Sequence, residues 1–135
     1  MTDVRPATRK YSERQAAFVD AATRLINRRG VSGMTLADVA SEMGVAAKAI
    51  AYYFKKKEDL ATACFLRSLG CLESIVQASE LEDTPTDRIG RLFELYFDFR
   101  CRALAGEVEE LANPNDIRAL NSAAVNEAYV ALFRS

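Results

Sequence analysis

Residues 35–60 read TLADVASEMGVAAKAIAYYFKKKEDL, and this stretch decides the fold. It predicts a short amphipathic helix capped by Thr35, with apolar side chains at helical spacing at Leu36, Val39, Ala40 and Met43. Gly44 then ends the helix, because glycine readily takes the left-handed conformation that closes one. The chain restarts at Val45 into a second helix. Two helices joined by so short a turn form a helix-turn-helix, whose second helix can lie in the major groove of DNA.

Ten positions of this stretch follow the spacing of one family pattern, T-x-x-x-I-A-x-x-A-G-V-S-x-G-T-L-Y-x-H-F-x-x-K-E-x-L. The matching residues are Thr35, Val39, Ala40, Gly44, Val45, Ile50, Phe54, Lys57, Glu58 and Leu60, and Tyr52 lies one residue after the tyrosine of the pattern. Through them the chain resembles the TetR/AcrR transcriptional repressors over about residues 12–72. The resemblance implies an all-α fold in which residues 12–72 form a three-helix, homeodomain-like DNA-binding head, with its helix-turn-helix at about 35–54. Residues 73–135 would then be part of a helical ligand-binding and dimerisation domain.

The resemblance also implies where the head binds double-stranded DNA at a palindromic operator. The DNA-binding residues that we expect are Thr35, Ala47, Lys48, Ala49, Tyr52, Tyr53 and Lys57. Thr35 and Lys57 would contact phosphates, because each begins a helix. One tyrosine is expected to face the phosphates, and the other to face the core in part. Lys48, the tyrosines and the alanine methyl groups, which can meet thymine methyls, remain to read bases.

The second helix departs from the family pattern at its start. Ala46 stands where the family usually has serine, so a side-chain cap worth about 1 kcal/mol is missing. The following Lys48-Ala49-Ile50-Ala51 replaces the usual G-T-L-Y and removes a hydroxyl and a tyrosine. DNA binding is therefore better supported than strong sequence specificity.

Charge divides the chain in the same way. Residues 1–57 contain eleven Lys and Arg residues and five acidic residues, whereas residues 58–135 contain seven Arg, no Lys and fourteen acidic residues. The net charge of −1 conceals this asymmetry. A basic N-terminal part can release counterions from a phosphate backbone, and an acidic remainder should face away from DNA.

Helical patterns continue on both sides of this stretch. Ser12 and Gln15 predict a capping box at the start of a helix that ends before Gly30, and a longer helix is expected from Lys56 to about Glu80. The following helix is predicted to start with Thr84 as its cap and Pro85 at its first helical position. Its residues 88–111 carry an apolar face wide enough to be buried on more than one side. A break at 113–115 precedes a last helix at 116–133, which includes Ile117, Leu120, Ala124 and Tyr129.

The aromatic side chains of residues 88–111 have two interpretations. They can be plain core, which is the usual role of aromatics at helical spacing. They can also line a pocket for a small apolar effector, which the resemblance implies. The candidate ligand-binding residues are Phe93, Tyr96, Phe97 and Arg100.

The resemblance also bears on assembly. Family members usually continue for further helices, the last two of which build a dimer, whereas this sequence ends at Ser135. The C-terminal domain is therefore expected to be incomplete, with a homodimer only where those helices are present. A monomer would hold only half of a palindromic operator.

Other classes of protein have weaker support. The chain lacks histidine and C-x-x-C spacing, so we expect no metal or cofactor, and its cysteines 64, 71 and 101 are buried free thiols or, for the first two, a redox-sensing pair. No apolar run of membrane-spanning length and no secretory signal occurs, which favours a cytoplasmic protein. An enzyme is not indicated, since no Gly-rich phosphate loop and no evident nucleophile-base pair is present. A shortened homologue that acts as an interaction module, or lacks operator binding, remains the alternative to a ligand-responsive repressor.

Overall fold

The structure, a computed structural model, describes residues 6–111 and 122–134. Its helices are α1 (Pro6–Arg29), α2 (Leu36–Glu42), α3 (Ala47–Ala51), α4 (Lys57–Ser79), α5 (Pro85–Leu104) and α7 (Ala123–Arg134). The two described ranges contain no strand, and the all-α fold is confirmed. None of their helices is long and apolar enough to cross a membrane.

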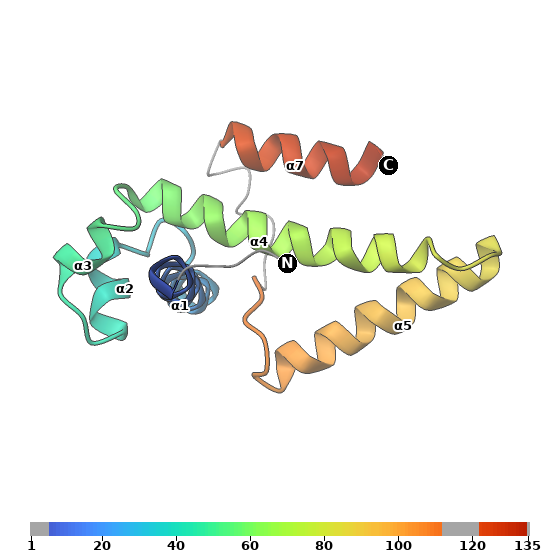
Figure 1. Ribbon diagram of the computed structural model, residues 1–135, viewed down its shortest axis with the longest axis horizontal. Coiled ribbons are helices and arrows are strands. Elements are labelled where there is room, and N and C mark those ends of the chain that lie inside the picture. Colours follow the sequence, from blue (N-terminus) through green and yellow to red (C-terminus); the bar gives the residue numbers. More distant parts are fainter. Residues whose placement is uncertain (1–5, 112–121, 135) are drawn as a thin grey trace.

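Helices α1, α2 and α3 and the start of α4 form a compact head. Figure 1 shows α1 end-on, with α2 and α3 on one side and α4 crossing it. The core of the head is fully buried and draws on every one of these helices, through Phe18, Leu25, Val39, Ile50, Leu60 and Phe65. This shared core fixes the direction in which the short helix α3 points.

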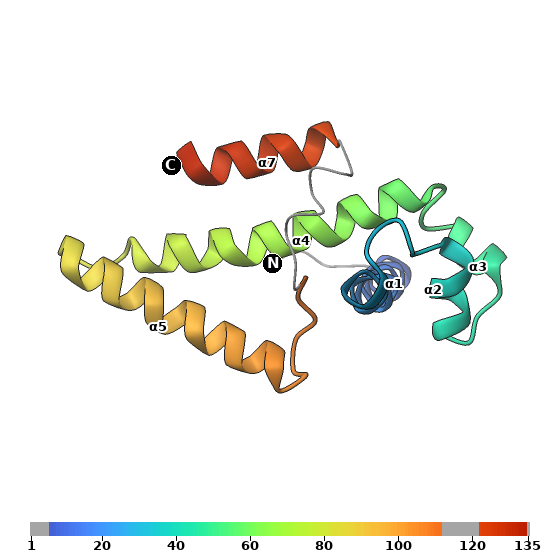
Figure 2. The same ribbon diagram turned by 180° about the vertical axis from the view of Figure 1, so that it is seen from behind.

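Helix α4 is the spine that joins the head to the rest of the chain. Helices α5 and α7 both pack against α4, and the two opposite views place them on different sides of it (Figures 1 and 2). The observed bounds of α4 lie within one residue of those expected from the sequence. Gly70 lies within this uninterrupted helix.

The start of α1 differs from the prediction. The helix begins at Pro6, so Ser12 lies inside it and the predicted capping box is wrong. Proline fits the first turn of a helix because its fixed φ suits that position and its missing N–H is not needed there. An Arg9–Glu13 ion pair at 3.0 Å, with i,i+4 spacing, joins these added turns.

Helix α5 begins as predicted and ends earlier than predicted. The Thr84 hydroxyl accepts a hydrogen bond from the Asp87 backbone N–H at 3.1 Å, and Pro85 is the first helical residue. The helix ends at Leu104 and not at Leu111, because Gly106 takes a left-handed conformation with φ of 78°. The Glu107 N–H then closes the end by donating to the Arg102 carbonyl at 2.9 Å.

The expected burial of α5 on more than one side is wrong. No α5 side chain is fully buried, and Phe93 and Phe97 are 56% and 59% exposed. The helix packs mainly against α4, with Leu92, Leu95 and Phe99 half-buried. Its second apolar stripe has no helix over it within the described part of the chain.

The predicted break at 113–115 and the first residues of the predicted last helix, including Ile117 and Leu120, lie outside the described residues. Within the range that is described, α7 occupies 123–134 and buries Val125 against the core. Helix α7 therefore agrees with the C-terminal part of that prediction.

Candidate DNA-binding surface

The start of α2 is held by its own first turn. The Thr35 side chain accepts a hydrogen bond from the Asp38 N–H at 3.1 Å, which confirms the predicted cap. The Asp38 carboxylate also faces the Arg29 guanidinium at 3.6 Å. Thr35 is exposed, so its backbone and hydroxyl lie on the surface of the head.

The turn between α2 and α3 depends on Gly44. Its φ of 68° is left-handed, as the sequence predicted, and the Val45 N–H returns to the Ala40 carbonyl at 3.0 Å. A residue with a side chain in this conformation would be strained by about 1–2 kcal/mol. The turn sets the angle between the two helices.

Helix α3 is short and is held by a single buried side chain. Ile50 is 1% exposed and belongs to the core, whereas the N-cap residue Ala46 makes no side-chain hydrogen bond. The missing cap expected at Ala46 is therefore confirmed. Packing through Ile50, and not local helix stability, keeps α3 in place.

Three of the four remaining side chains of α3 are exposed. Ala47 and Lys48 are exposed, and Ala49 is half-buried. Tyr52, directly after the helix, is 74% exposed. The surface is small and mostly methyl groups, as the sequence indicated, with one cation and one phenol ring upon it.

The two tyrosines after α3 face different surroundings. The Tyr53 ring is half-buried and lies 5.2 Å from the Phe18 ring, whereas Tyr52 meets Tyr53 edge-on at 5.1 Å and stays exposed. This is the division between surface and core that the sequence predicted. Tyr11 of α1 completes the cluster at 4.8 Å from the Tyr53 ring and 5.9 Å from the Tyr52 ring. Sequence reasoning missed Tyr11, because more than forty residues separate it from its partners.

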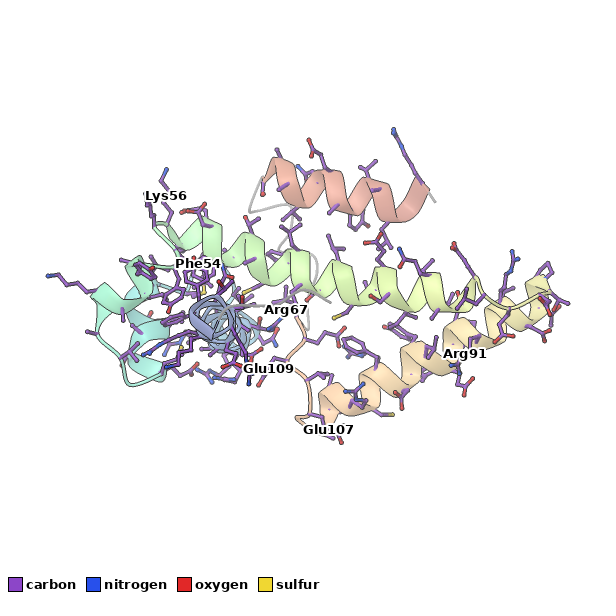
Figure 3. All side chains as sticks on the ribbon, in the orientation of Figure 1. Phe54, Lys56, Arg67, Arg91, Glu107 and Glu109 are labelled. Carbon is purple, nitrogen blue, oxygen red and sulfur yellow. The ribbon has the colours of Figure 1, made fainter. Side chains whose placement is uncertain are left out.

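The lysine run between α3 and α4 spreads over the surface beside them. Lys55 and Lys56 are exposed, and Figure 3 shows Lys56 pointing away from the head while Phe54 points into it. The Lys57 ammonium donates to the Ser32 carbonyl at 3.3 Å. Since Ser32 lies three residues before Thr35, the structure brings the starts of α2 and α4 together.

Ion pairing separates the cations of the head into two groups. Arg9, Arg24, Arg28 and Arg29 each face a carboxylate. Among the residues that the structure describes, Lys10, Arg14, Lys48, Lys55 and Lys56 make no ion pair. Cations without an acidic partner are the ones available to an external anion.

The predicted ligand-binding residues of α5 do not line the cavity that lies beside the C-terminal end of this helix. Phe93 and Phe97 stack at 6.1 Å on the exposed side of the helix, and Tyr96 lies edge-on to Phe97 at 5.9 Å. Arg100 pairs with Glu110 at 2.5 Å. The structure thus brings the three aromatics together on the surface, and it ties Arg100 to the segment after α5.

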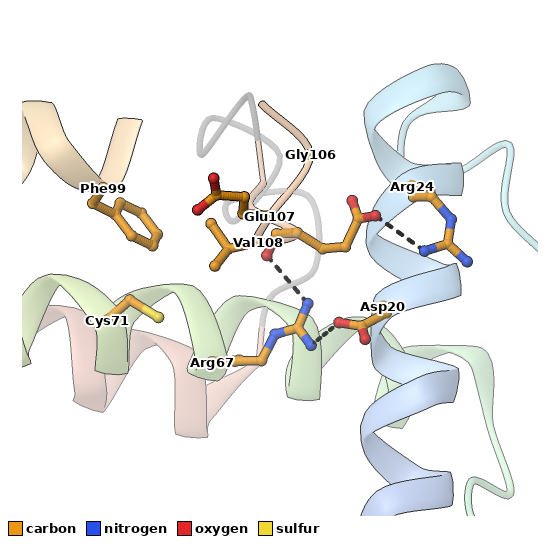
Figure 4. Close-up of a pocket in the computed structure, with 9 residues that line it drawn as sticks. Asp20, Arg24, Arg67, Cys71, Phe99, Gly106, Glu107 and Val108 are labelled. Atoms are coloured by element: carbon orange, nitrogen blue, oxygen red, sulfur yellow. Dashed lines mark hydrogen bonds and ion pairs between the residues drawn. The ribbon is translucent and has the colours of Figure 1, made fainter. Parts of the chain in front are cut away.

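A cavity of about 430 Å³ lies where α1, α4, α5 and the segment after α5 meet. It is lined by Asp20, Arg24, Arg67, Cys71, Phe99, Gly106, Glu107, Val108 and Glu109. Arg67 donates to the Asp20 carboxylate, as Figure 4 shows, and also to the Glu109 carbonyl, while Arg24 donates to the Glu109 carboxylate. Those three distances are 2.5, 3.3 and 3.0 Å. The sequence signal for this site was weak, since its charged residues come from segments far apart in the chain.

The three cysteines are free thiols in different surroundings. Cys64 is buried, Cys71 is half-buried beside the cavity, and Cys101 is exposed. Burial raises the pKa of the Cys64 thiol, and a hydrogen bond with Thr23 opposes this in part. A redox-sensing cysteine needs an accessible thiolate, so Cys64 fits the structural interpretation.

The sequence of the head matches known regulators. Residues 18–64 match the family described as "Bacterial regulatory proteins, tetR family". The HTH-type transcriptional regulator BetI of Rhizobium meliloti is 34% identical over 85 residues, which are 62% of this chain and 42% of BetI. The HTH-type transcriptional regulator TtgR of Pseudomonas putida is 35% identical over 80 residues, which are 59% of this chain and 38% of TtgR. The matched part thus spans about two fifths of these curated relatives.

The fold is similar to two solved structures. The fatty acid degradation regulator FadR from Bacillus halodurans has a TM-score of 0.59 and 22% identity, with 87% of this chain and 65% of that chain covered. FadR from Bacillus subtilis, in complex with stearoyl-CoA, has a TM-score of 0.59, 21% identity and the same coverage. At this identity the likeness concerns the fold. The matched head, residues 18–64, is that of the TetR family of bacterial regulatory proteins.

Proposed function

We propose that this chain is a DNA-binding transcriptional regulator, with repression as its mode of action, whose helix α3 enters the major groove. One observation carries the proposal: α3 is anchored in the core through Ile50 and exposes Ala47 and Lys48, beside lysines that have no acidic partner. A helix anchored in this way can be inserted into a groove without unfolding the head. Such a function places the protein in the cytoplasm with the chromosome.

Each predicted contact residue takes a role that its position supports. Lys48, Ala47 and Ala49 face the bases, by a charged hydrogen bond and by methyl contacts with thymine. Tyr52 reaches the backbone through its exposed hydroxyl.

Phosphate binding falls to the residues at the starts of α2 and α4. The Lys57 ammonium has three donors, of which the Ser32 carbonyl takes one, so two remain for phosphate. Thr35 lies three residues from Ser32 and offers its backbone N–H and hydroxyl to the same strand. Tyr53 supports Tyr52 from the core side.

Titration of duplex DNA by the purified chain tests this function. Bound sequences are first selected from a random duplex pool, and the selected and scrambled duplexes are then compared by fluorescence anisotropy at several salt concentrations. We expect a dissociation constant of roughly 10⁻⁴–10⁻⁶ M for scrambled duplex, falling affinity with salt, and tighter binding of the selected duplex. Lys48→Ala should reduce the preference for the selected duplex. Binding that is absent, or insensitive to salt, would contradict the function.

We infer that the regulator responds to a small molecule in the cavity between α1, α4 and α5. Its volume of about 430 Å³ falls within the usual range for ligand pockets. Phe99 and Val108 provide apolar surface, and the ion pairs Arg24–Glu109 and Arg67–Asp20 provide polar groups of both signs. A small molecule with both apolar and polar groups therefore suits it better than the small apolar effector expected from the sequence. Because Arg24 and Asp20 belong to α1, such a ligand would act directly on the head.

We further propose that two subunits bind a palindromic operator together. Such an operator needs two recognition helices about 34 Å apart. Helix α5 exposes Ile89, Phe93 and Phe97, which favours association with another chain. The same exposed stripe supports the alternative of an interaction module, and DNA titration separates the two.

A further inference from the structure

The first turns of α1 are fixed against the DNA-binding surface. Tyr11 is the link, with its ring 4.8 Å from the Tyr53 ring and 5.9 Å from the exposed Tyr52 ring. Tyr11 itself is 37% exposed, so it lies at the surface where that cluster opens to solvent. Residues 6–17 precede the matched family segment of 18–64, and yet they are part of the same rigid helix.

The charges on these turns are arranged in two flanks. Arg9 and Glu13 lie one turn apart and pair with each other at 3.0 Å. Lys10 and Arg14 are also one turn apart, at i,i+4 spacing on one side of Tyr11, and both are exposed. Like charges at this spacing repel each other and destabilise a helix. In the described structure no carboxylate pairs with either of them, so this flank has unused positive charge.

Lys10 and Arg14 lie close enough to Tyr52 to meet the DNA duplex that α3 is proposed to bind. Lys10 adjoins Tyr11, and Arg14 lies less than one helical turn, or about 5 Å, further along the axis. Tyr11 in turn touches Tyr52, which the proposed function places at the phosphates. A duplex bound at Tyr52 would therefore lie beside the turns of α1 that carry Lys10 and Arg14.

We propose that the first turns of α1 are a second phosphate-binding element, in which Lys10 and Arg14 contact the DNA backbone and Tyr11 positions them beside α3. This inference rests on the proposed function and extends it beyond the helix-turn-helix. Its ligand is the sugar-phosphate backbone, so it adds affinity for any duplex and no sequence preference.

The salt dependence of binding to a mixed-sequence duplex tests the proposal with the full chain. Each phosphate contact contributes about 0.9 to the slope of log affinity against log salt. The Lys10→Ala/Arg14→Ala variant should therefore lose about two units of slope, equally on selected and scrambled duplexes. Arg9→Ala removes one charge from the opposite flank of the same turns, and it should change the slope less than Lys10→Ala does. Arg88→Ala/Arg91→Ala removes two charges from α5 and should leave the slope unchanged.

The outcomes separate this inference from the proposed function. If the wild-type chain binds DNA and Lys48→Ala weakens it, but the Lys10/Arg14 variant keeps the wild-type slope, the inference fails and the function stands. If the wild-type chain does not bind DNA, both fail. If Arg9→Ala and Lys10→Ala reduce the salt slope equally, the turns act through their overall positive charge and not through two phosphate contacts, and the inference is wrong. Because both side chains are exposed, melting curves of the variants should match the wild type and exclude loss of folding.

Discussion

Tyr52 and Tyr53 are adjacent in the chain, but their rings differ in burial and in packing. Tyr53 packs on Phe18 and Tyr11 and is half-buried, whereas Tyr52 rests edge-on against Tyr53 with most of its surface in solvent. The Tyr52 hydroxyl is therefore free to meet a phosphate without any change in the head. The Tyr53 ring holds the platform on which Tyr52 lies.

Removal of single hydroxyl groups distinguishes these roles. Tyr52→Phe should weaken binding of a selected duplex by about twofold to tenfold, the value of one hydrogen bond of roughly 0.5–1.5 kcal/mol, and leave the free energy of unfolding unchanged. Tyr53→Phe keeps the ring contacts and is the matched control. Anisotropy titration and urea unfolding measure the two quantities. If Tyr52→Phe leaves affinity as unchanged as Tyr53→Phe does, the Tyr52 hydroxyl makes no contact with DNA.

Residue-level signals were predictable where the chemistry is local. Thr35, Gly44 and Thr84 act on backbone groups within four residues, so their roles followed from sequence spacing. Tyr11 and Glu109 act on residues far away in the chain, and no spacing rule describes them. The tertiary fold alone reveals these contacts.

At the scale of elements, α3 is the least self-sufficient helix of the head. It has five residues and an alanine at its N-cap position, with φ of −68° and ψ of 148°. That backbone conformation is already the extended one that N-cap residues adopt. A serine there would need no rearrangement to accept a hydrogen bond from the first turn.

We therefore expect Ala46→Ser to stabilise the protein by about 1 kcal/mol. Thr35→Ala, which removes the cap that α2 does have, should destabilise it by a similar amount. Urea unfolding followed by circular dichroism measures both changes. If Ala46→Ser instead destabilises the protein, the serine side chain is crowded in the folded head. The expectation that a serine at this position can cap α3 would then be wrong.

Helix boundaries were predicted well where a cap or a breaker marked them and poorly elsewhere. The starts of α2 and α5 have threonine caps, but Ser12 offered a similar signal inside α1 and misled the prediction. The end of α5 at Leu104, shortly before Gly106, was overlooked because the apolar pattern continues to Leu111. Leu111 is indeed buried, but as part of a returning segment that packs on the core.

At the scale of the whole molecule, residues 105–111, the segment after α5, connect this helix to the head. The Glu110 carbonyl of this segment accepts from Asn27 at 2.8 Å, and the Glu109 carbonyl and carboxylate accept from Arg67 and Arg24. The wide apolar face of α5 was read from the sequence, but its burial depends on what covers it. Sequence patterns give the face of a helix and do not name its partner.

Arg67 lies at the centre of these connections, since it joins α4 to Asp20 of α1 and to the Glu109 carbonyl. Its side chain is 31% exposed, so each contact is weaker than a fully buried one. We expect Arg67→Met to reduce the free energy of unfolding by about 1–2 kcal/mol, because the hydrogen bonds of a charged group are lost while the aliphatic packing is kept. Arg91→Met, which removes the exposed i,i+3 pair with Glu94, should cost under about 0.5 kcal/mol.

Proteolysis shows where the loss of Arg67 acts. A glutamate-specific protease can cut after Glu109 and Glu110, and we expect these two half-buried sites to be protected as long as the segment stays docked on α1 and α4. Arg67→Met should expose them and accelerate cleavage there, whereas Arg91→Met should leave the cleavage rate at the wild-type value. Equal rates in the two variants, with equal stabilities, would mean that Leu111 and Asn27 hold the segment without Arg67. Faster cleavage confined to Arg67→Met would instead show that Arg67 holds this segment against α1 and α4.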